Sequence, residues 1–342
     1  MRYGSSTLDA ELSLAAETIT RASRDATVLL ACHVSPDGDA LGSMLGFGLG
    51  LRRLGFTKVY ASFPEPFEVA EPFRFLPGLD LLVDPGKAPA RPDVAVSFDA
   101  ASPGRLGELI GALEAAPTWI MLDHHGTNTG FGSVRLVDPD AAATAVVAVD
   151  LLDRLGVDLD REIATCFYVA IATDTGSFKF DATTPDVLAL AARLVEVGAQ
   201  PGDISRRVFD TRPFAAIQLL AEVLNRAELD PSAAGGRGLV SAYATLADLE
   251  RYGQPTHVLE SFMDVVRTAA EADVACLVKP VAPGQWAVSL RSKGGTDVAA
   301  VAVALGGGGH RLAAGFTGYG EAAEVLAAVR DELDPSEKIR VD

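Results

Sequence analysis

The chain has 342 residues, of which 49% are hydrophobic, and its formal net charge is −17. This length and composition predict a folded protein of about two domains with a sizeable core. The negative charge argues against a protein that coats long nucleic acids, because binding to a phosphate backbone depends on clustered lysine and arginine. The sequence contains no uninterrupted apolar run of about eighteen residues, so we expect no membrane association.

Three cysteines, Cys32, Cys166 and Cys276, lie far apart within separate apolar runs. Their spacing is not typical of a disulfide framework or a zinc ribbon. We therefore expect buried thiols in a reducing compartment. The N-terminal residues are polar and amphipathic and do not resemble a signal peptide, so the expected location is cytoplasmic.

The first half of the chain alternates apolar runs typical of strands with amphipathic segments typical of helices. Strands are expected at residues 28–32, 58–63, 93–99 and 118–125. Helices are expected at residues 9–24, 40–54, 141–155 and 162–172. This β-α alternation predicts an α/β domain with a mainly parallel, doubly wound sheet covered by helices on both faces.

The second half begins with a helical pattern and ends in a smaller α/β unit. Residues 231–238 are rich in glycine and small residues and are interpreted as a flexible linker. Beyond it, the expected strands are 239–243, 274–279 and 286–289, and the expected helices are 258–270 and 321–333. We therefore expect a catalytic domain over 1–182, a helical connector and linker over 183–235, and a substrate-binding domain over 236–334. The active site is expected in a cleft between the two domains.

Imidazoles and carboxylates gather where the predicted elements of the first domain end. They are His33, Asp37, Asp39, Asp99, Asp123, His124, His125 and Asp174. Ligands of open α/β sheets bind at the carboxyl edge of the strands, which is where most of these residues are expected to meet. Asp37 alone could equally be a turn or helix-capping residue, and the same alternative applies to Asp99 and Asp174. Several separate clusters at one edge together favour a functional site.

Such a set of residues suits a pair of hard divalent cations. Carboxylates mixed with one or two imidazoles favour manganese, with magnesium as the alternative. In a site of this kind two ions share a hydroxide that attacks phosphorus, and they neutralise the oxygens of an in-line displacement. The sequence therefore predicts phosphoryl chemistry without a covalent intermediate.

Four consecutive glycines at 306–309 precede His310 in the C-terminal domain. Without side chains, the backbone N–H groups of this stretch can approach a phosphate closely. Three cations are nearby in the sequence: Arg291, Lys293 and Arg311. Arg291 offers a bidentate phosphate contact that lysine cannot reproduce. The alternative interpretation is a glycine-rich turn before a buried strand.

These motifs resemble a known family. The pattern His33-x-x-x-Asp37-x-Asp39, with Asp99, Asp123-His124-His125 and Asp174, is similar to the four motifs of the DHH phosphoesterase superfamily. Residues 291–294 and 306–316 resemble its DHHA1 substrate-binding domain. The resemblance covers roughly residues 28–334. It is strongest to the nanoRNase and pAp-phosphatase (NrnA-like) group, which includes actinobacterial members that act on cyclic di-AMP and pApA.

The resemblance implies a role for each motif residue. One ion would be held by His33, Asp37 and Asp99, and the other by Asp39, Asp99, His124 and Asp174, so that Asp99 bridges the two. His125 would act on the substrate phosphate, and Asp123 would orient its neighbours. The residues implied in substrate binding are Asn128, Arg291, Ser292, Gly307, Gly308, Gly309 and His310, of which His310 would also take part in catalysis.

The expected function is a manganese-dependent phosphohydrolase that degrades short nucleotides. Its substrates would be pApA and other nanoRNAs and the 3′-phosphate of pAp, with cyclic di-AMP as a further candidate. Alternatives are an inorganic pyrophosphatase, an exopolyphosphatase, a RecJ-like single-strand exonuclease, or a nucleotide-binding protein without catalysis. The resemblance also implies a homodimer.

Overall fold

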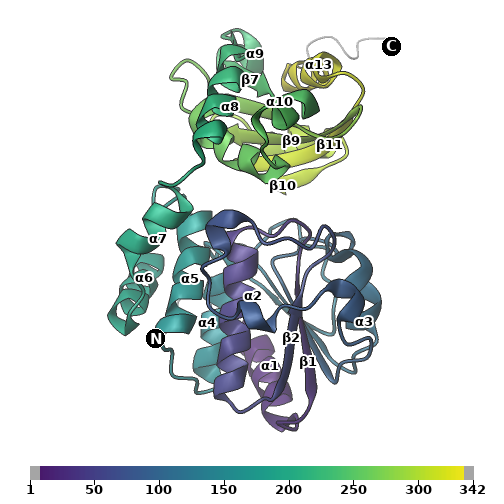
Figure 1. Ribbon diagram of the computed structural model, residues 1–342, viewed down its shortest axis with the longest axis vertical. Helices are drawn as coiled ribbons and strands as arrows, with labels where there is room; N and C mark the ends of the chain where they lie inside the picture. The colour runs from purple at the N-terminus through teal and green to yellow at the C-terminus, as the bar shows by residue number, and fades with distance from the viewer. Residues whose placement is uncertain (1–7, 335–342) are drawn as a thin grey trace. The chain divides into compact units, whose positions relative to one another are not determined.

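The computed structural model describes residues 8–334, which belong to two compact units (Figure 1). The first unit ends at Thr211 and the second begins at Arg212. The elements of the first unit are α1 (Asp9–Arg21), β1 (Thr27–Cys32), α2 (Gly38–Arg53), β2 (Lys58–Ser62), β3 (Val94–Phe98), α3 (Ile110–Glu114), β4 (Trp119–Asp123), β5 (Val134–Val137), α4 (Thr144–Arg154), α5 (Arg161–Asp174), α6 (Pro185–Val197) and α7 (Pro201–Val208). Among the described helices, none is both long and apolar enough to cross a membrane.

The sheet of the first unit has five parallel strands in the order β2-β1-β3-β4-β5. Successive residues of a strand point to opposite faces. Leu30 and Val96 pack into the core that contains α1, α2, α4 and α5, whereas Leu29 and Ala95 pack against α3 and the 3-10 helix before it. Figure 1 shows α2, α4 and α5 on one side of the sheet and α3 on the other. The predicted doubly wound α/β fold is confirmed.

The strand order creates a topological switch point between β1 and β3. The chain runs from β1 to β2 at one side and then returns to place β3 at the other side of β1. In open α/β sheets the crevice for ligands forms at such a point, beyond the carboxyl ends of the two strands. His33 directly follows β1 and Asp99 directly follows β3. The fold therefore brings these two predicted site residues to the same crevice.

Helices α2 and α5 pack closely through a glycine of α2. A Cβ atom at Gly42 would overlap the carbonyl oxygen of Cys166 and would lie 3.0 Å from the Cβ of Ala170. The contact matters for function because α2 carries Asp39 and α5 ends at Asp174. Glycine at position 42 thus sets how closely two site-bearing helices approach.

We expect Gly42→Ala to lower the free energy of unfolding by about 1–3 kcal/mol, because the added methyl group forces the two helices apart. Chemical denaturation followed by circular dichroism measures this change. Gly111→Ala in α3 is the matched control, since a Cβ there meets nothing within 4 Å. Replacement of glycine by alanine within a helix is then neutral or stabilising by up to about 1 kcal/mol. Equal losses in both variants would contradict the packing argument.

The second unit contains a six-stranded mixed sheet in the order β10-β11-β9-β8-β7-β6, in which only β7 and β8 pair in parallel. Helices α12 and α13 pack on one face, and α8, α10 and α11 cover the other face at β7 and β8. Its elements are α8 (Phe214–Asn225), β6 (Glu228–Asp230), α9 (Ala233–Gly236), β7 (Leu239–Tyr243), α10 (Leu246–Tyr252), α11 (Met263–Val266), β8 (Val274–Ala282), β9 (Gln285–Ser292), α12 (Val298–Ala304), β10 (Gly308–His310), β11 (Ala313–Tyr319) and α13 (Ala322–Leu333).

The segments between 183 and 270 differ in detail from the expectation. Helices α6 and α7 belong to the first unit and α8 to the second, so the helical stretch is divided between them. Two residues of the glycine-rich stretch 231–238, Ala233 and Ala234, are buried against α13 and the sheet. The helix expected at 258–270 is a 3-10 helix (Thr256–Phe262) followed by the short α11. Within 231–238 the structure thus adds packing contacts for Ala233 and Ala234 that composition did not indicate, and the flexible linker stays a prediction.

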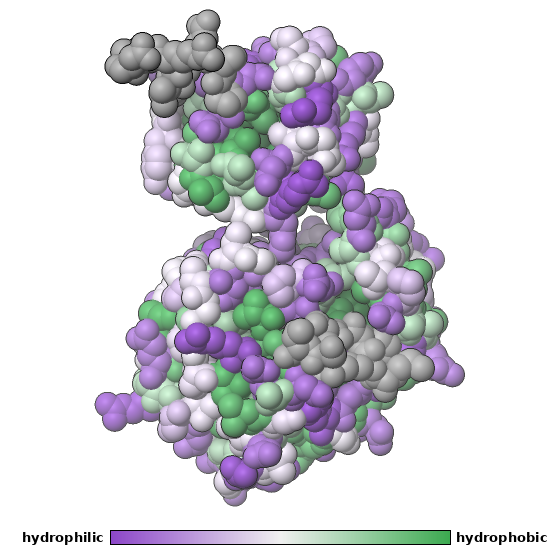
Figure 2. Space-filling model, turned by 180° about the vertical axis from the view of Figure 1, so that it is seen from behind, coloured by the Kyte–Doolittle hydropathy of each residue, from purple (hydrophilic) through white to green (hydrophobic). Residues whose placement is uncertain are grey.

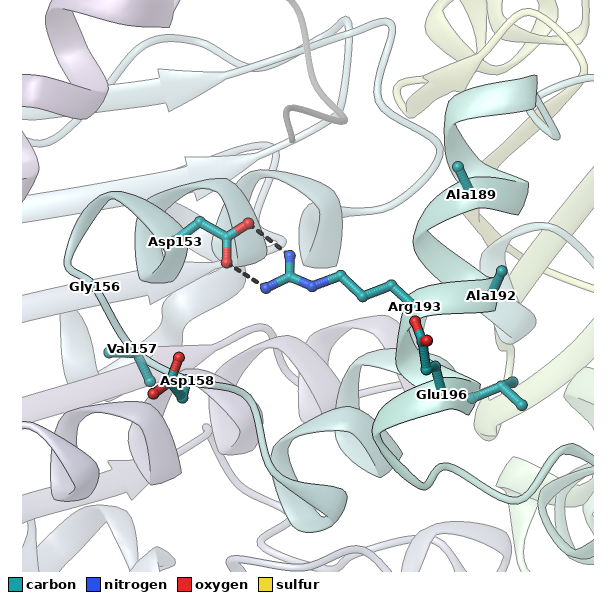
Figure 3. A pocket seen from close by; sticks show the side chains of 9 residues that line it. Asp153, Gly156, Val157, Asp158, Ala189, Ala192, Arg193 and Glu196 are labelled. Atoms are coloured by element: carbon teal, nitrogen blue, oxygen red, sulfur yellow. Dashed lines mark hydrogen bonds and ion pairs between the residues drawn. The ribbon is translucent and has the colours of Figure 1, made fainter.

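A groove in the first unit runs between the α4–α5 connection and α6. Arg193 of α6 forms a bidentate ion pair with Asp153 of α4, with N–O distances of 2.6 and 2.7 Å (Figure 3). This groove lies at the C-terminal end of α4, whereas the predicted site residues lie near the N-terminal end of that helix.

On the face drawn in Figure 2, hydrophilic and apolar residues are interspersed, and the apolar ones form small groups.

Candidate active site

The turn after β1 combines a helix cap with a site residue. Asp37 is the N-cap of α2, and its Oδ1 accepts a hydrogen bond of 3.0 Å from the N–H of Ala40. The same oxygen lies 3.9 Å from Nε2 of His33. The two interpretations of Asp37 are therefore compatible, because capping holds its carboxylate beside His33. Asp39 follows in the first turn of α2 and is fully buried.

Asp99 lies at the centre of the site. Its backbone is left-handed, with φ of 55°, a conformation that Asp and Asn adopt more readily than most residues. The side chain is 3% exposed. Oδ2 lies 3.5 Å from Nε2 of His33, and Oδ1 lies 3.5 Å from Nε2 of His124. The two oxygens of one carboxylate thus face two different imidazoles.

Asp123 anchors the residues that follow β4. Its Oδ1 accepts the backbone N–H of His124 at 2.8 Å and lies 2.7 Å from Nδ1 of His125. Nδ2 of Asn128 donates to Oδ2 of Asp123. Because Asp123 is fully buried, these contacts hold both histidines and Asn128 in a fixed arrangement.

His124 is surrounded by carboxylates. Its Nδ1 lies 3.2 Å from the carbonyl oxygen of Ala141, which orients Nε2 toward the acidic residues. Nε2 lies 3.2 Å from Oδ2 of Asp174, at the C-terminal end of α5, and 3.9 Å from Oδ2 of Asp39. The first unit thus brings together all six predicted metal ligands, although they come from five different elements or their ends.

The protonation of these groups reflects their mutual charges. Burial acts to raise the pKa of Asp99, but His33, His124 and His125 hold it below its ordinary value. Burial acts to lower the pKa of His124, but Asp174 and the other carboxylates raise it well above its ordinary value. Burial raises the pKa of Asp174 to about 6, against the opposing effect of His124. A divalent cation binds only the deprotonated forms of these groups, so it competes with protons at His124 and Asp174.

The donor atoms fit hard divalent cations. One group consists of His33, Asp37 and Asp99, and a second consists of Asp39, Asp99 and His124; within each group the possible ligand atoms lie within 4.8 Å of one another. All donors are imidazole nitrogens or carboxylate oxygens, which suits manganese or magnesium. Asp99 belongs to both groups.

Arg291 and His310 share one face of the second sheet. Arg291 of β9 pairs with Ala313 of β11, and Ala313 pairs in turn with His310 of β10. Residues directly opposite each other in an antiparallel ladder lie on the same face, so Arg291 and His310 flank Ala313 about 10 Å apart. Nη1 of Arg291 donates to the carbonyl oxygen of Leu290 at 3.0 Å.

The other predicted cations of this region bind the backbone. Nζ of Lys293 donates to the carbonyl oxygen of Ala269, and Nη2 of Arg311 donates to that of Gly294 at 3.0 Å. The hydroxyl oxygen of Ser292 accepts the N–H of Gly294 at 3.0 Å, so Ser292 shapes the same loop. Lys293 and Arg311 thus support the loop, and a contact of either cation with a phosphate stays a prediction.

The glycines at 307–309 differ in whether their surroundings leave room for a side chain. A Cβ at Gly307 would overlap the carbonyl oxygen of Gly315, and a Cβ at Gly309 would lie 2.5 Å from Cα of Ala314. A Cβ at Gly308 would meet nothing within 4 Å. Close packing on β11 explains Gly307 and Gly309, whereas no packing contact requires glycine at 308.

Comparisons with known proteins identify the family. The chain matches the family model described as the DHH family, N-terminal domain, over residues 27–171, and the DHHA1 domain over residues 240–334. It is 36% identical over 311 residues to a Thermus thermophilus protein named bifunctional oligoribonuclease and PAP phosphatase NrnA, which covers 90% of each chain. This chain belongs to the DHH family. The resemblance found in its motifs is confirmed.

Other relatives of this DHH-family chain agree. A Bacillus subtilis protein with the same name as the Thermus protein is 26% identical, covering 88% of this chain and 93% of that one. The crystal structure of an exopolyphosphatase-related protein from Bacteroides fragilis matches with a TM-score of 0.84 at 23% identity, covering 95% of this chain and 96% of that chain. The structural likeness supports the fold of the DHH-family chain.

Three residues of the DHH-family site were not predicted. Thr144 donates from its N–H to Asp39 at 2.6 Å and from its hydroxyl to Asp99 at 3.0 Å. Ser43 donates to Asp39 at 2.8 Å. Nη2 of Arg105 lies 2.9 Å from Nδ1 of His33. Ser43 follows Asp39 by one helical turn, and this spacing could have indicated their contact. The sequence contains no comparable indication that Thr144 contacts Asp39 and Asp99 or that Arg105 contacts His33.

Proposed function

We propose that this DHH-family chain hydrolyses phosphoester bonds of short nucleotides. Its substrates would be pApA and other very short RNAs and the 3′-phosphate of pAp, with cyclic di-AMP as a further candidate. The observation that carries the proposal is Asp99, whose two oxygens face His33 and His124 within two adjoining groups of ligands. The names of the Thermus and Bacillus relatives support the same substrates.

Two divalent cations, manganese before magnesium, would be held by six residues of the first unit. These are His33, Asp37, Asp39, Asp99, His124 and Asp174. Bound cations would polarise the phosphoryl group and activate water at neutral pH. The chain itself contributes a fixed set of donors: the contact between His124 and Ala141 sets one imidazole, and the helix cap at Asp37 sets one carboxylate.

His125 would act on the substrate directly. Burial acts to lower the pKa of His125, but Asp123 and Asp99 raise it above its ordinary value. A protonated imidazole binds a phosphate oxygen or donates a proton to a leaving oxygen. Asp123, itself held by Asn128, fixes the ring through Nδ1 and so orients His125 for either task.

The second unit would recognise the substrate. Arg291 and His310, on one sheet face, provide a guanidinium and an imidazole for phosphate groups. The backbone at Gly308, where a Cβ meets nothing within 4 Å, can approach a phosphate. The net charge of −17 supports short substrates over long nucleic acids. A cytoplasmic homodimer remains part of the proposal, on the grounds of composition and resemblance.

One substrate panel tests the function. The purified protein with Mn²⁺ is given pApA, pAp, cyclic di-AMP, pyrophosphate and single-stranded DNA, and products are separated by chromatography. We expect hydrolysis of pApA and pAp, and loss of that activity when a chelator removes the cations. Preferred hydrolysis of pyrophosphate or of long DNA would favour an alternative enzyme. Intact nucleotides in every metal-loaded reaction would refute the proposal.

A further inference from the structure

We propose that Thr144 is a positioning residue for one of the two cation sites and leaves the other unaffected. Thr144 would fix the oxygens of Asp39 and Asp99 that face His124. The inference rests on the proposed function, because it concerns the cations, and it adds a residue to which no metal ligand motif points.

The two oxygens of Asp39 have different surroundings. Oδ1 accepts two hydrogen bonds, from the hydroxyl of Ser43 at 2.8 Å and from the N–H of Ala145 at 3.1 Å. Oδ2 accepts the N–H of Thr144 at 2.6 Å and lies 3.9 Å from Nε2 of His124. A carboxylate oxygen has two lone pairs, so Oδ1 is filled and Oδ2 retains one. Asp39 therefore offers a cation its Oδ2 atom, on the side of His124.

The hydroxyl of Thr144 sets the rotation of Asp99. It donates to Oδ1 at 3.0 Å, and this is the oxygen that faces His124. The terminal torsion of an aspartate has a broad energy minimum, so the carboxylate needs a partner to hold one orientation. Oδ2 has a contact of its own, because it lies 3.5 Å from Nε2 of His33, whose Nδ1 lies 2.9 Å from the carbonyl oxygen of Val34 and 2.9 Å from Nη2 of Arg105.

The start of α4 makes Thr144 a rigid support. Thr144 is fully buried and is the first residue of α4, whose N-cap, Ala143, makes no side-chain hydrogen bond to the helix. The first N–H groups of a helix lack partners within the helix. Here Asp39 accepts two of them, from Thr144 and Ala145, so that α4 and the carboxylate stabilise each other.

The contacts of Thr144 are one-sided. Both fall on oxygens that face His124, one on Asp39 and one on Asp99. Among the residues that the structure describes, Thr144 donates no hydrogen bond to His33, to Asp37 or to Oδ2 of Asp99. Loss of the hydroxyl should therefore weaken cation binding beside His124 and spare binding beside His33.

Calorimetric titration of Mn²⁺ into metal-depleted protein tests this. Thr144→Val removes the hydroxyl and keeps the backbone N–H; Thr144→Ala does the same without placing a methyl group where the oxygen lay. For both variants we expect the Mn²⁺ affinity of one site to fall by about 10–100-fold, while the affinity of the other site changes less than about threefold. Thr144→Ser should restore the weakened affinity, because serine keeps the hydroxyl. Ser62→Ala is the control, because this buried hydroxyl in β2 donates to the carbonyl of Val83 at 2.9 Å.

The outcomes separate the two proposals. Suppose that the wild-type protein binds two cations and that the variants bind both with unchanged or equally weakened affinity. This result would overturn the role of Thr144 and leave the proposed function standing. The role of Thr144 would also be overturned if both affinities fell and the metal-free variants melted at a lower temperature than the wild-type protein. Wild-type protein that binds no divalent cation would overturn the proposed function itself.

Discussion

Asp99→Asn is expected to reduce hydrolysis of pAp and pApA by at least about 1,000-fold. Asparagine replaces one of the two carboxylate oxygens with an NH2 group, which does not bind a cation. Residue 99 would then offer a ligand oxygen on the side of His33 or on the side of His124, and no longer on both sides. Asparagine suits the left-handed backbone at this position, whereas alanine would add strain. Steady-state kinetics and the number of Mn²⁺ ions bound per chain measure the effect together.

Asp93→Asn is the matched control for this change. Asp93 precedes the same strand that Asp99 follows, and its Oδ2 accepts the N–H of Thr27 at 2.7 Å. An asparagine oxygen can accept that hydrogen bond, so activity and cation binding should stay at wild-type levels. Wild-type activity in Asp99→Asn with both ions bound would refute the bridging assignment.

Arg291→Lys and His310→Ala are expected to raise KM for pApA by about 10–100-fold, since a hydrogen bond to a charged group contributes about 1.5–3 kcal/mol. Lysine keeps the charge of Arg291 but loses the planar fork that binds two phosphate oxygens. Cation binding should be unchanged, because neither residue is among the six proposed cation ligands of the first unit, which include the groups His33, Asp37, Asp99 and Asp39, Asp99, His124. Kinetics and Mn²⁺ titration on the same preparations test both statements.

Arg251→Lys provides the control in the second unit. Arg251 is an exposed residue of α10 whose guanidinium lies 5.4 Å from the ring centre of Tyr252. Its replacement should leave KM unchanged. If Arg291→Lys and His310→Ala also leave KM unchanged, this sheet face has no part in substrate binding.

Much of the first unit could be predicted because its signals are local. The apolar runs of β1, β3 and β4 end in polar residues, and parallel strands place such ends at one edge. This edge argument predicted the candidate ligands His33, Asp99 and His124 without knowledge of their contacts. The short edge strand β5 was missed, since its four residues carry little periodic signal.

The second unit was harder to predict. Its interior elements α12 and β10 are short, and the pairing of β10 with β11 depends on close approach at Gly307 and Gly309. The glycine run was interpreted through phosphate binding, although packing explains two of its members. Charge counting at 291–311 likewise failed to show that Lys293 and Arg311 would bind backbone carbonyls, because such partners depend on loop conformation.

The sequence by itself determined the fold class, the family and the identity of the candidate ligands, because strand periodicity and motif spacing are properties of neighbouring residues. Only the tertiary structure decided how the ligands are oriented. Which oxygen of Asp39 or Asp99 faces His124 depends on the start of α4, where Thr144 meets both carboxylates. That contact joins segments far apart in the chain, and packing of α4 against α2 creates it.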